Sequence, residues 1–104
     1  MQTIITARHC EVPDPLRARA MSVVQRLGNL ASRAMEMTVV FDTEGLQQTA
    51  ELRLHLKSGE MLVASGDAVD HRTAMDRAEE KLRRQLERAS RPRRSRVRQS
   101  NNSL

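Results

Sequence analysis

The sequence predicts an α+β fold, a two-layer β-α-β-β-β-α sandwich in which a four-stranded sheet carries two helices on one face. Two segments have apolar residues at spacings of three and four, which is typical of amphipathic helices. Between them, apolar and polar residues alternate over residues 33–66, which is typical of half-buried strands. At 104 residues the chain can bury one core. We therefore expect one domain, residues 1–90, followed by a disordered arginine-rich tail, residues 91–104.

The first two elements are a short strand and a helix. Residues 2–7 contain two isoleucines between threonines, which favours a β-branched strand. Pro13-Asp14-Pro15 should end that strand and start a helix, because Asp14 can cap free backbone N–H groups and proline suits the first helical turn. The helix, over about 15 to 31, would bury one stripe formed by Leu16, Ala20, Val23, Leu27 and Leu30.

Three strands should follow as an antiparallel meander. In the first of them, Arg33 to Asp42, alternate positions are apolar: Met35, Met37, Val39 and Phe41. The second alternates between Ala50, Leu52, Leu54 and Leu56 on one face and Glu51, Arg53, His55 and Lys57 on the other. Ser58-Gly59 supplies a tight turn into the third, Met61 to Gly66.

Asp70 is the expected cap of a last helix that runs to about Ser90. Its apolar positions are Met75, Ala78, Leu82, Leu86 and Ala89. A crossover connection would lay the first helix over the sheet, and the last helix would cover the remainder of the same face.

Positive charge is concentrated at the C-terminal end of the chain. Residues 91–104 contain five arginines and no acidic residue, and they account for the whole formal net charge of +5. Within the last predicted helix, basic residues at spacings of four and three form one stripe away from the apolar face: Arg77, Lys81, Arg84, Arg88 and, if the helix reaches it, Arg91. Such a density of cations indicates a polyanionic partner.

Two interpretations of this stripe compete. One is a solvated helix surface with ion pairs at i,i+4, such as Glu79 with Arg83 and Glu80 with Arg84. The other is a phosphate-binding surface, because cations at like-charge spacing cost some stability unless an anion binds them. Since the stripe continues directly into the arginines of the tail, we favour the second interpretation. We expect the last helix and the tail to hold RNA phosphates.

The composition restricts how RNA could be recognised. Phe41 is the only aromatic residue, and the strand alternation places it in the core. Stacking of bases on aromatic side chains is therefore not expected. Contacts from arginine and lysine to phosphates suit a folded RNA that is recognised by its shape.

Other classes of function find little support in the sequence. The serines lack a histidine and an acid in a known catalytic pattern, and no glycine-rich phosphate loop is present, so we expect neither an enzyme nor a cofactor. The histidines and the single cysteine, Cys10, lack metal-ligand spacing, so we expect no metal. No apolar run approaches the roughly 18 residues of a membrane span, and one cysteine fits a reducing cytoplasm. We expect a soluble cytoplasmic protein that does not bind membranes.

The last third of the chain resembles the ribosome hibernation-promoting factor family, also called sigma-54 modulation proteins. The resemblance is carried by Ala64-Ser65, by Asp70 opening a helix with Ala74, Met75 and Asp76, and by the segment Lys81-Leu82-Arg83-Arg84-Gln85-Leu86. The strand at Ile4, the loop Glu11-Val12-Pro13 and the order of the strands agree with it over roughly residues 1–90. Two positions differ from the family pattern: Arg72 stands where tyrosine is common, and Val23 where a basic residue is common.

The resemblance implies a translation inhibitor that binds the small ribosomal subunit near the decoding region and promotes hibernation in non-growing cells. It implies contacts with ribosomal RNA from Lys81, Arg84 and Arg88 and, on the first helix, from Arg17 and Arg26. Together with the stripe and the tail, the expected RNA-binding residues are Arg17, Arg26, Arg77, Lys81, Arg84, Arg88, Arg91, Arg93 and Arg94. The chain looks like a short form, for which a second hibernation factor is a further candidate partner.

Two rival functions are kept open. One is a general module for structured RNA away from the ribosome. The other is a protein-interaction module that uses the polar sheet face, with Glu51, Arg53, His55 and Lys57, or an open sheet edge. That face has little apolar area, which argues against a tight obligate dimer and predicts a monomer off the ribosome.

Overall fold

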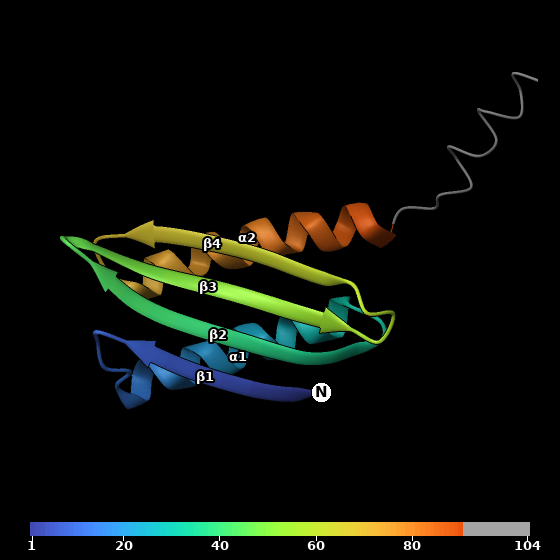
Figure 1. Cartoon of the computed structure of the whole chain (residues 1–104), viewed down its shortest axis with the longest axis horizontal. Helices are drawn as coiled ribbons and strands as arrows, with labels where there is room; N and C mark the ends of the chain where they lie inside the picture. The colour runs from blue at the N-terminus through green and yellow to red at the C-terminus, as the bar shows by residue number, and fades with distance from the viewer. Residues whose placement is uncertain (91–104) are drawn as a thin grey trace, which may run out of the picture.

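The computed structural model describes residues 1–90 and shows the predicted order of elements (Figure 1). Their bounds are β1 Gln2–Arg8, α1 Asp14–Leu30, β2 Ala34–Glu44, β3 Gln47–Leu56, β4 Met61–Ala68 and α2 His71–Ser90. The predicted α+β fold is therefore confirmed, and most predicted boundaries lie within two residues of the observed ones. The predicted tail, with Arg91, Arg93 and Arg94, lies outside the described residues.

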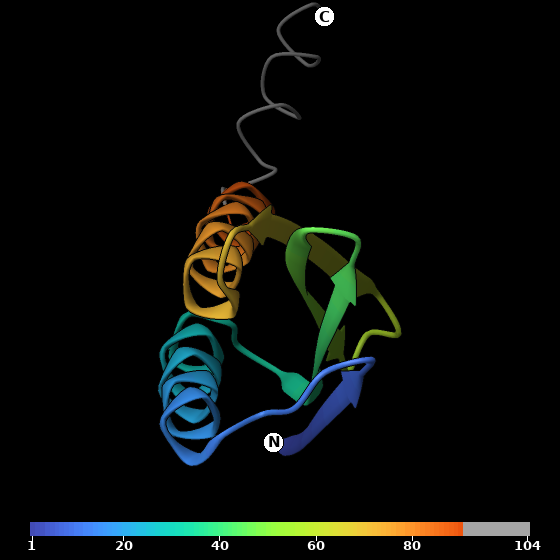
Figure 2. The same ribbon diagram turned by 90° about the vertical axis from the view of Figure 1, so that its left-hand side faces the viewer.

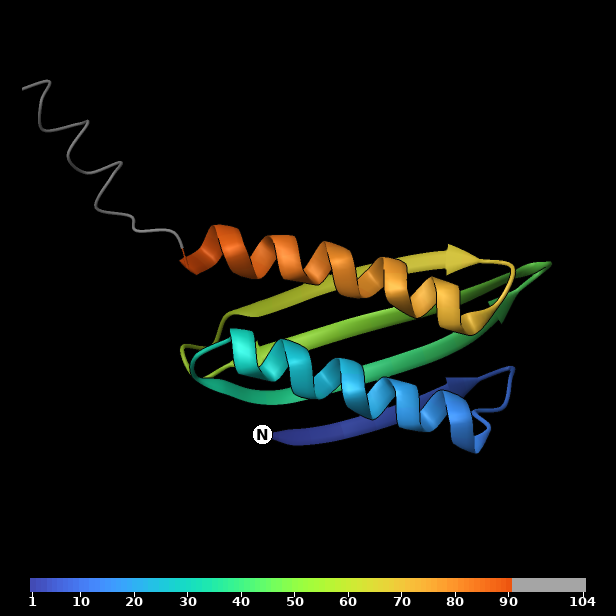
Figure 3. The same ribbon diagram turned by 180° about the vertical axis from the view of Figure 1, so that it is seen from behind.

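The four strands form one sheet in the order β1-β2-β3-β4. β1 runs parallel to β2, and the other two pairs are antiparallel. Both helices cover the same face of the sheet, and they lie side by side (Figures 2 and 3). No helix or strand of residues 1–90 covers the opposite face of the sheet, which we call the open face. The hairpin turns contain Gly45 and Gly59, which have φ values of +63° and +95°, in the left-handed region that favours glycine.

The core lies between the sheet and the helices. The alternation predicted for β3 is confirmed, because Ala50, Leu52 and Leu54 are fully buried and Leu56 packs partly against them. Phe41 is also fully buried, as predicted. Both helices bury apolar side chains against the sheet, including two that the predicted stripes missed, Val24 and Ala74. The buried apolar residues are Ala20, Val23, Val24 and Leu27 on α1, and Ala74, Met75, Ala78, Leu82 and Leu86 on α2.

Met35 does not join the core, which corrects the predicted alternation of β2. Ala34 pairs with Leu56 and Glu36 pairs with His55, so Met35 is the extra residue of a β-bulge and its side chain is exposed. A bulge reverses the side-chain phase of the strand at that point. Val40 also departs from the alternation of β2, because its side chain is buried although it lies on the open face of the sheet.

Asp14 does not cap α1, which corrects a second prediction. The N-cap is Pro13, which forms no side-chain cap bond, and its carbonyl accepts a hydrogen bond from the N–H of Arg17 at 2.9 Å. Asp14 is already inside the first turn, so its carboxylate cannot occupy the cap position. Leu30, predicted to end the apolar stripe, is exposed at the other end of the helix.

Among the helices of residues 1–90, none is both long and apolar enough to span a bilayer. Over the same residues, no three side chains of His, Cys, Asp or Glu gather closely enough to hold a metal ion.

Candidate nucleic-acid interface

The candidate interface is built on α2, whose start is fixed by Asp70. The Oδ1 atom of Asp70 accepts a hydrogen bond from the backbone N–H of Thr73 at 2.7 Å, and Oδ2 accepts one from the Thr73 hydroxyl at 3.1 Å. These bonds lower the pKa of the Asp70 carboxyl below its ordinary value, and the bond from the backbone N–H has the larger effect. The predicted cap is confirmed, and it satisfies backbone donors that would otherwise be free.

Gly66 allows α2 to approach β4 closely. A Cβ atom at this position would overlap the carbonyl oxygen of Ala74, and it would lie 2.9 Å from the backbone nitrogen of Ala78. The helix backbone therefore packs directly against the strand. This close approach sets the distance between the following turns of α2 and the edge of the sheet.

Three side chains of α2 hydrogen-bond to the outer edge of β4. Arg77 donates to the carbonyl of Asp67 at 2.6 Å, Lys81 to that of Ser65 at 2.9 Å, and Gln85 to that of Val63 at 2.9 Å. Four residues of helix rise about 6.0 Å and two residues of strand about 6.6 Å, so the two spacings match. We call this set, Arg77, Lys81 and Gln85 with their three carbonyls, the edge ladder.

Four of the predicted cations share the side of α2 next to β4, and we call this surface the β4 flank: Arg77, Lys81, Arg84 and Arg88. Two of them belong to the edge ladder, which directs their side chains along the sheet edge. Arg84 pairs with Glu80 at 3.0 Å, but both side chains are exposed. The side chain of Arg88 is exposed and forms no ion pair or hydrogen bond within residues 1–90. The flank therefore keeps donors available to an external anion.

The other side of α2, the α1 flank, has its charges in internal ion pairs. It consists of Asp76, Glu79 and Arg83 together with the two arginines of α1 that face them. Arg19 pairs with Asp76 at 2.9 Å. Arg26 donates from Nε and Nη2 to the two oxygens of Glu79, both at 3.0 Å. Only 7% of Glu79 is exposed, and it also accepts a bond from Arg83 at 3.2 Å.

Arg26 is therefore committed to the contact between the helices. Its bidentate hydrogen bonds to Glu79 raise the pKa of the guanidinium above its ordinary value. Arg17, the other predicted residue of α1, is exposed and makes no side-chain hydrogen bond within residues 1–90. Val23 is fully buried, so that position contributes to the core.

The structure also shows side chains whose part in the site the sequence did not indicate. Gln85 joins the edge ladder, and Arg19 and Glu79 hold the helices together across more than 50 residues of sequence. Such contacts have no local periodicity. The two i,i+4 pairs that the spacing did predict, Glu79 with Arg83 and Glu80 with Arg84, are both present.

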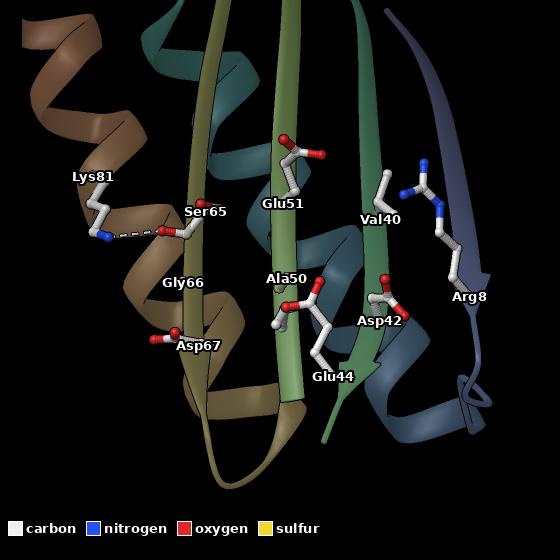
Figure 4. A pocket seen from close by; sticks show the side chains of 11 residues that line it. Arg8, Val40, Asp42, Glu44, Ala50, Glu51, Ser65, Gly66, Asp67 and Lys81 are labelled. Atoms are coloured by element: carbon white, nitrogen blue, oxygen red, sulfur yellow. Dashed lines mark hydrogen bonds between the residues drawn. The ribbon is translucent and has the colours of Figure 1, made fainter. Parts of the chain in front are cut away.

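The open sheet face has a different character. It contains a shallow polar hollow of about 320 Å³, and Figure 4 shows Arg8, Asp42, Glu51 and Asp67 around it, with Lys81 at its margin. His9 lies 3.0 Å from the Asp42 carboxylate, and this contact lowers the pKa of Asp42. With several carboxylates in its walls, the hollow is not suited to phosphate. The β4 flank is the better candidate for an RNA surface.

Comparison with known proteins identifies the family of this chain. The family described as Sigma 54 modulation protein / S30EA ribosomal protein matches residues 3–94. A ribosome hibernation promoting factor of Pseudomonas putida is 34% identical over 86 residues, which are 83% of each chain. One of Azotobacter vinelandii is also 34% identical over 86 residues, 83% of this chain and 79% of that one. A ribosome hibernation promotion factor of Rhizobium meliloti is 27% identical over 92 residues, which are 88% of this chain but 48% of the longer relative.

Solved structures share the fold. A ribosomal subunit interface protein from Coxiella burnetii superposes with a TM-score of 0.75 at 17% identity, covering 88% of this chain and all of that one. The N-terminal domain of Protein Y from Thermus thermophilus gives a TM-score of 0.72 at 23% identity, covering 85% and 98%. The match over residues 3–94 and the relatives at 34% identity show that this chain belongs to the Sigma 54 modulation protein / S30EA ribosomal protein family.

Proposed function

We propose that this chain promotes ribosome hibernation by binding the small ribosomal subunit. Family membership and the names of its relatives support the role. The observation that carries the mechanism is the β4 flank of α2, whose four cations are exposed to solvent: Arg77, Lys81, Arg84 and Arg88. The Asp70 cap fixes where this helix starts, and Gly66 fixes its distance from β4. A ribosomal partner places the protein in the cytoplasm.

The β4 flank is suited to ribosomal RNA because its cations are held in place before binding. Arg77 uses one of its five N–H donors, and Lys81 one of its three, on backbone carbonyls. The remaining donors make no other hydrogen bond within residues 1–90 and can contact phosphates. A side chain that is already ordered loses less entropy on binding than a free one. Arg91, Arg93 and Arg94 follow α2 in sequence and add three further positive charges to the proposed RNA-binding residues.

The two predicted residues of α1 have unequal parts in this proposal. Arg17 is exposed and available for a phosphate. Arg26 is held by Glu79, so a phosphate must compete with a bidentate carboxylate for it. We place the principal contacts on α2 and a secondary contact at Arg17.

Binding near the decoding region would inhibit translation, because messenger and transfer RNA occupy that site in working ribosomes. The chain would act when growth stops, with a second hibernation factor as a further partner on the ribosome. Recognition would depend on the shape of folded RNA, since the single aromatic side chain, Phe41, is buried in the core.

The test is charge reversal on the β4 flank. The double variant Arg84→Glu/Arg88→Glu should fold normally and lose co-sedimentation with purified small subunits, because two cations become anions facing phosphate. The matched control is Arg53→Glu/Lys57→Glu, which changes the net charge equally but lies on the open sheet face and the turn that follows it. It should still sediment with small subunits.

Two results would contradict the proposal. One is retention of the folded Arg84→Glu/Arg88→Glu variant on small subunits, which would remove α2 from the interface. The other is equal affinity of the natural protein for small subunits and for an unrelated structured RNA at physiological salt, which would favour a general RNA-binding module.

A further inference from the structure

The two edges of the sheet differ in how they are closed. At the β4 edge, the edge ladder occupies the carbonyls of Val63, Ser65 and Asp67. At the β1 edge, no side chain or backbone group within residues 1–90 hydrogen-bonds to the outer side of the strand. Figure 1 shows β1 along the margin of the sheet, with no further strand of residues 1–90 beside it. An unpaired edge offers a row of donors and acceptors to another strand.

β1 also lacks the usual features that prevent strand addition. Residues 2–8 contain no proline, and their pairing with β2 is regular without a bulge. The only charged residue is Arg8, at the end of the strand. Ile4, in the middle of the strand, exposes apolar surface. Proteins that avoid edge pairing place charges, prolines or bulges within such strands.

We propose that β1 pairs with β1 of a second copy of this chain, antiparallel and about a two-fold axis, so that the two sheets become continuous. For both sheets to keep their helices on the same side, residues on the open face must pair with each other. A register centred on Ile5 satisfies this condition: Ile4 lies opposite Thr6, and Gln2 lies opposite Arg8. The isoleucine at the centre then packs against its own copy.

Charge complementarity favours this register. Glu36 lies next to Gln2 in the same row of the sheet, so Arg8 of one copy comes within two strand spacings, about 10 Å between Cα atoms, of Glu36 of the other. An extended arginine and a glutamate can span that distance together. Neither side chain has an ion-pair partner within residues 1–90. The two-fold axis creates this pair twice.

The pairing should be weak. One strand from each copy buries less than the roughly 1,200 Å² of a small stable interface, so the chain is monomeric when dilute and pairs as its concentration rises. The geometry leaves the β4 flank free, because β1 and β4 are opposite edges of the sheet. A pair would present two basic flanks at its outer ends. The self-association does not depend on the proposed function, and it can be measured without ribosomes.

Analytical ultracentrifugation of the full chain, free of nucleic acid, tests the proposal. The weight-average mass should rise towards twice the monomer mass between micromolar and millimolar protein. Ile4→Lys should keep it at the monomer value, because a charge then lies in the middle of the new strand pair. Val63→Lys is the matched control: Val63 is 42% exposed where Ile4 is 39%, and it lies in the same row of the sheet but on the closed β4 edge.

Charge exchange tests the register. Arg8→Glu and Glu36→Arg should each reduce the mass increase, and the double variant Arg8→Glu/Glu36→Arg should restore it, with circular dichroism checking that each variant folds. A monomer at every concentration would overturn the proposal. So would equal effects of Ile4→Lys and Val63→Lys, and a double variant that fails to recover would overturn the register.

Discussion

On the side of α2 that faces α1, the acidic and basic side chains satisfy each other, and Glu79 holds two arginines from different helices. On the side that faces β4, carbonyl groups of the strand hold Arg77 and Lys81, and a carbonyl carries no net charge to cancel theirs. The same residue types therefore have different uses on the two flanks. A carboxylate partner turns an arginine into a structural contact, whereas a carbonyl partner orders a cation and leaves it available to phosphate.

Gly66 is the position at which we expect a single substitution to disturb the β4 flank most strongly. Gly66→Ala adds a Cβ that overlaps the Ala74 carbonyl oxygen, so α2 must move away from β4 and the edge ladder must lengthen. We expect the free energy of unfolding to fall by about 3 kcal/mol, as for other overpacked sites. Urea denaturation measures it. Ser65→Ala, its exposed neighbour, should change stability by less than about 0.5 kcal/mol; similar values for the two variants would show that the close approach is not needed.

Glu79 tests the α1 flank. Glu79→Gln removes a buried carboxylate that accepts charged hydrogen bonds from Arg26 and Arg83, and we expect a loss of about 2 kcal/mol in stability. Glu80→Gln breaks the exposed pair with Arg84 and should cost under about 0.5 kcal/mol. Small-subunit affinity should not fall in Glu79→Gln, because two guanidinium groups gain freedom to contact phosphate. A marked loss of affinity with little loss of stability would place Glu79 in the RNA site.

The sequence predicts well what depends on neighbours along the chain. The alternation of Leu52 and Leu54 and the cap at Asp70 each follow from residues within four positions, and both are observed. The prediction that Met35 faces the core is wrong, because a β-bulge shifts the side-chain phase of the strand. Periodicity alone does not reveal where a strand takes an extra residue. The prediction that Asp14 caps the first helix is also wrong, because prolines stand on both sides of it and the cap lies one residue earlier, at Pro13.

The candidate site is less predictable, because its deciding contacts are distant in sequence. The stripe of Arg77, Lys81, Arg84 and Arg88 follows from helical spacing. That Arg26 is held by Glu79, 53 residues away, depends on how α1 packs against α2. The edge ladder depends in the same way on the close packing of α2 against β4. Spacing thus identifies which cations share a face, and tertiary packing decides which of them remain available.

Asp70 affects stability in a pH-dependent way. Its pKa is lowered in the folded protein, so its contribution is complete above the ordinary value of 3.8 and is lost as the pH falls through the lowered value. Asp70→Ala should therefore reduce the melting temperature at pH 7, and the difference from the natural chain should shrink in acid. Asp14→Ala, which removes an acid from the first turn of α1 without removing a cap bond, should have a smaller effect. Equal effects would contradict the special role of the Asp70 cap.

Deletion of residues 91–104 should have no effect on stability and a moderate effect on binding. The deleted segment consists mostly of arginine, serine and asparagine, a composition that does not form a core, so the melting temperature should not change. It contains five of the 18 basic residues, and each phosphate contact that is lost makes the salt dependence of binding shallower. If all five contacted phosphates, the logarithmic salt slope would fall by about four units, and because such segments rarely engage every charge we expect about two. Titration of small subunits at several salt concentrations gives the slope.

The shortened chain should bind more weakly at the same place, because the β4 flank sets the position of binding. An unchanged slope would show that the arginines of the deleted segment do not contact the subunit. Loss of folding would show that the domain extends beyond residue 90.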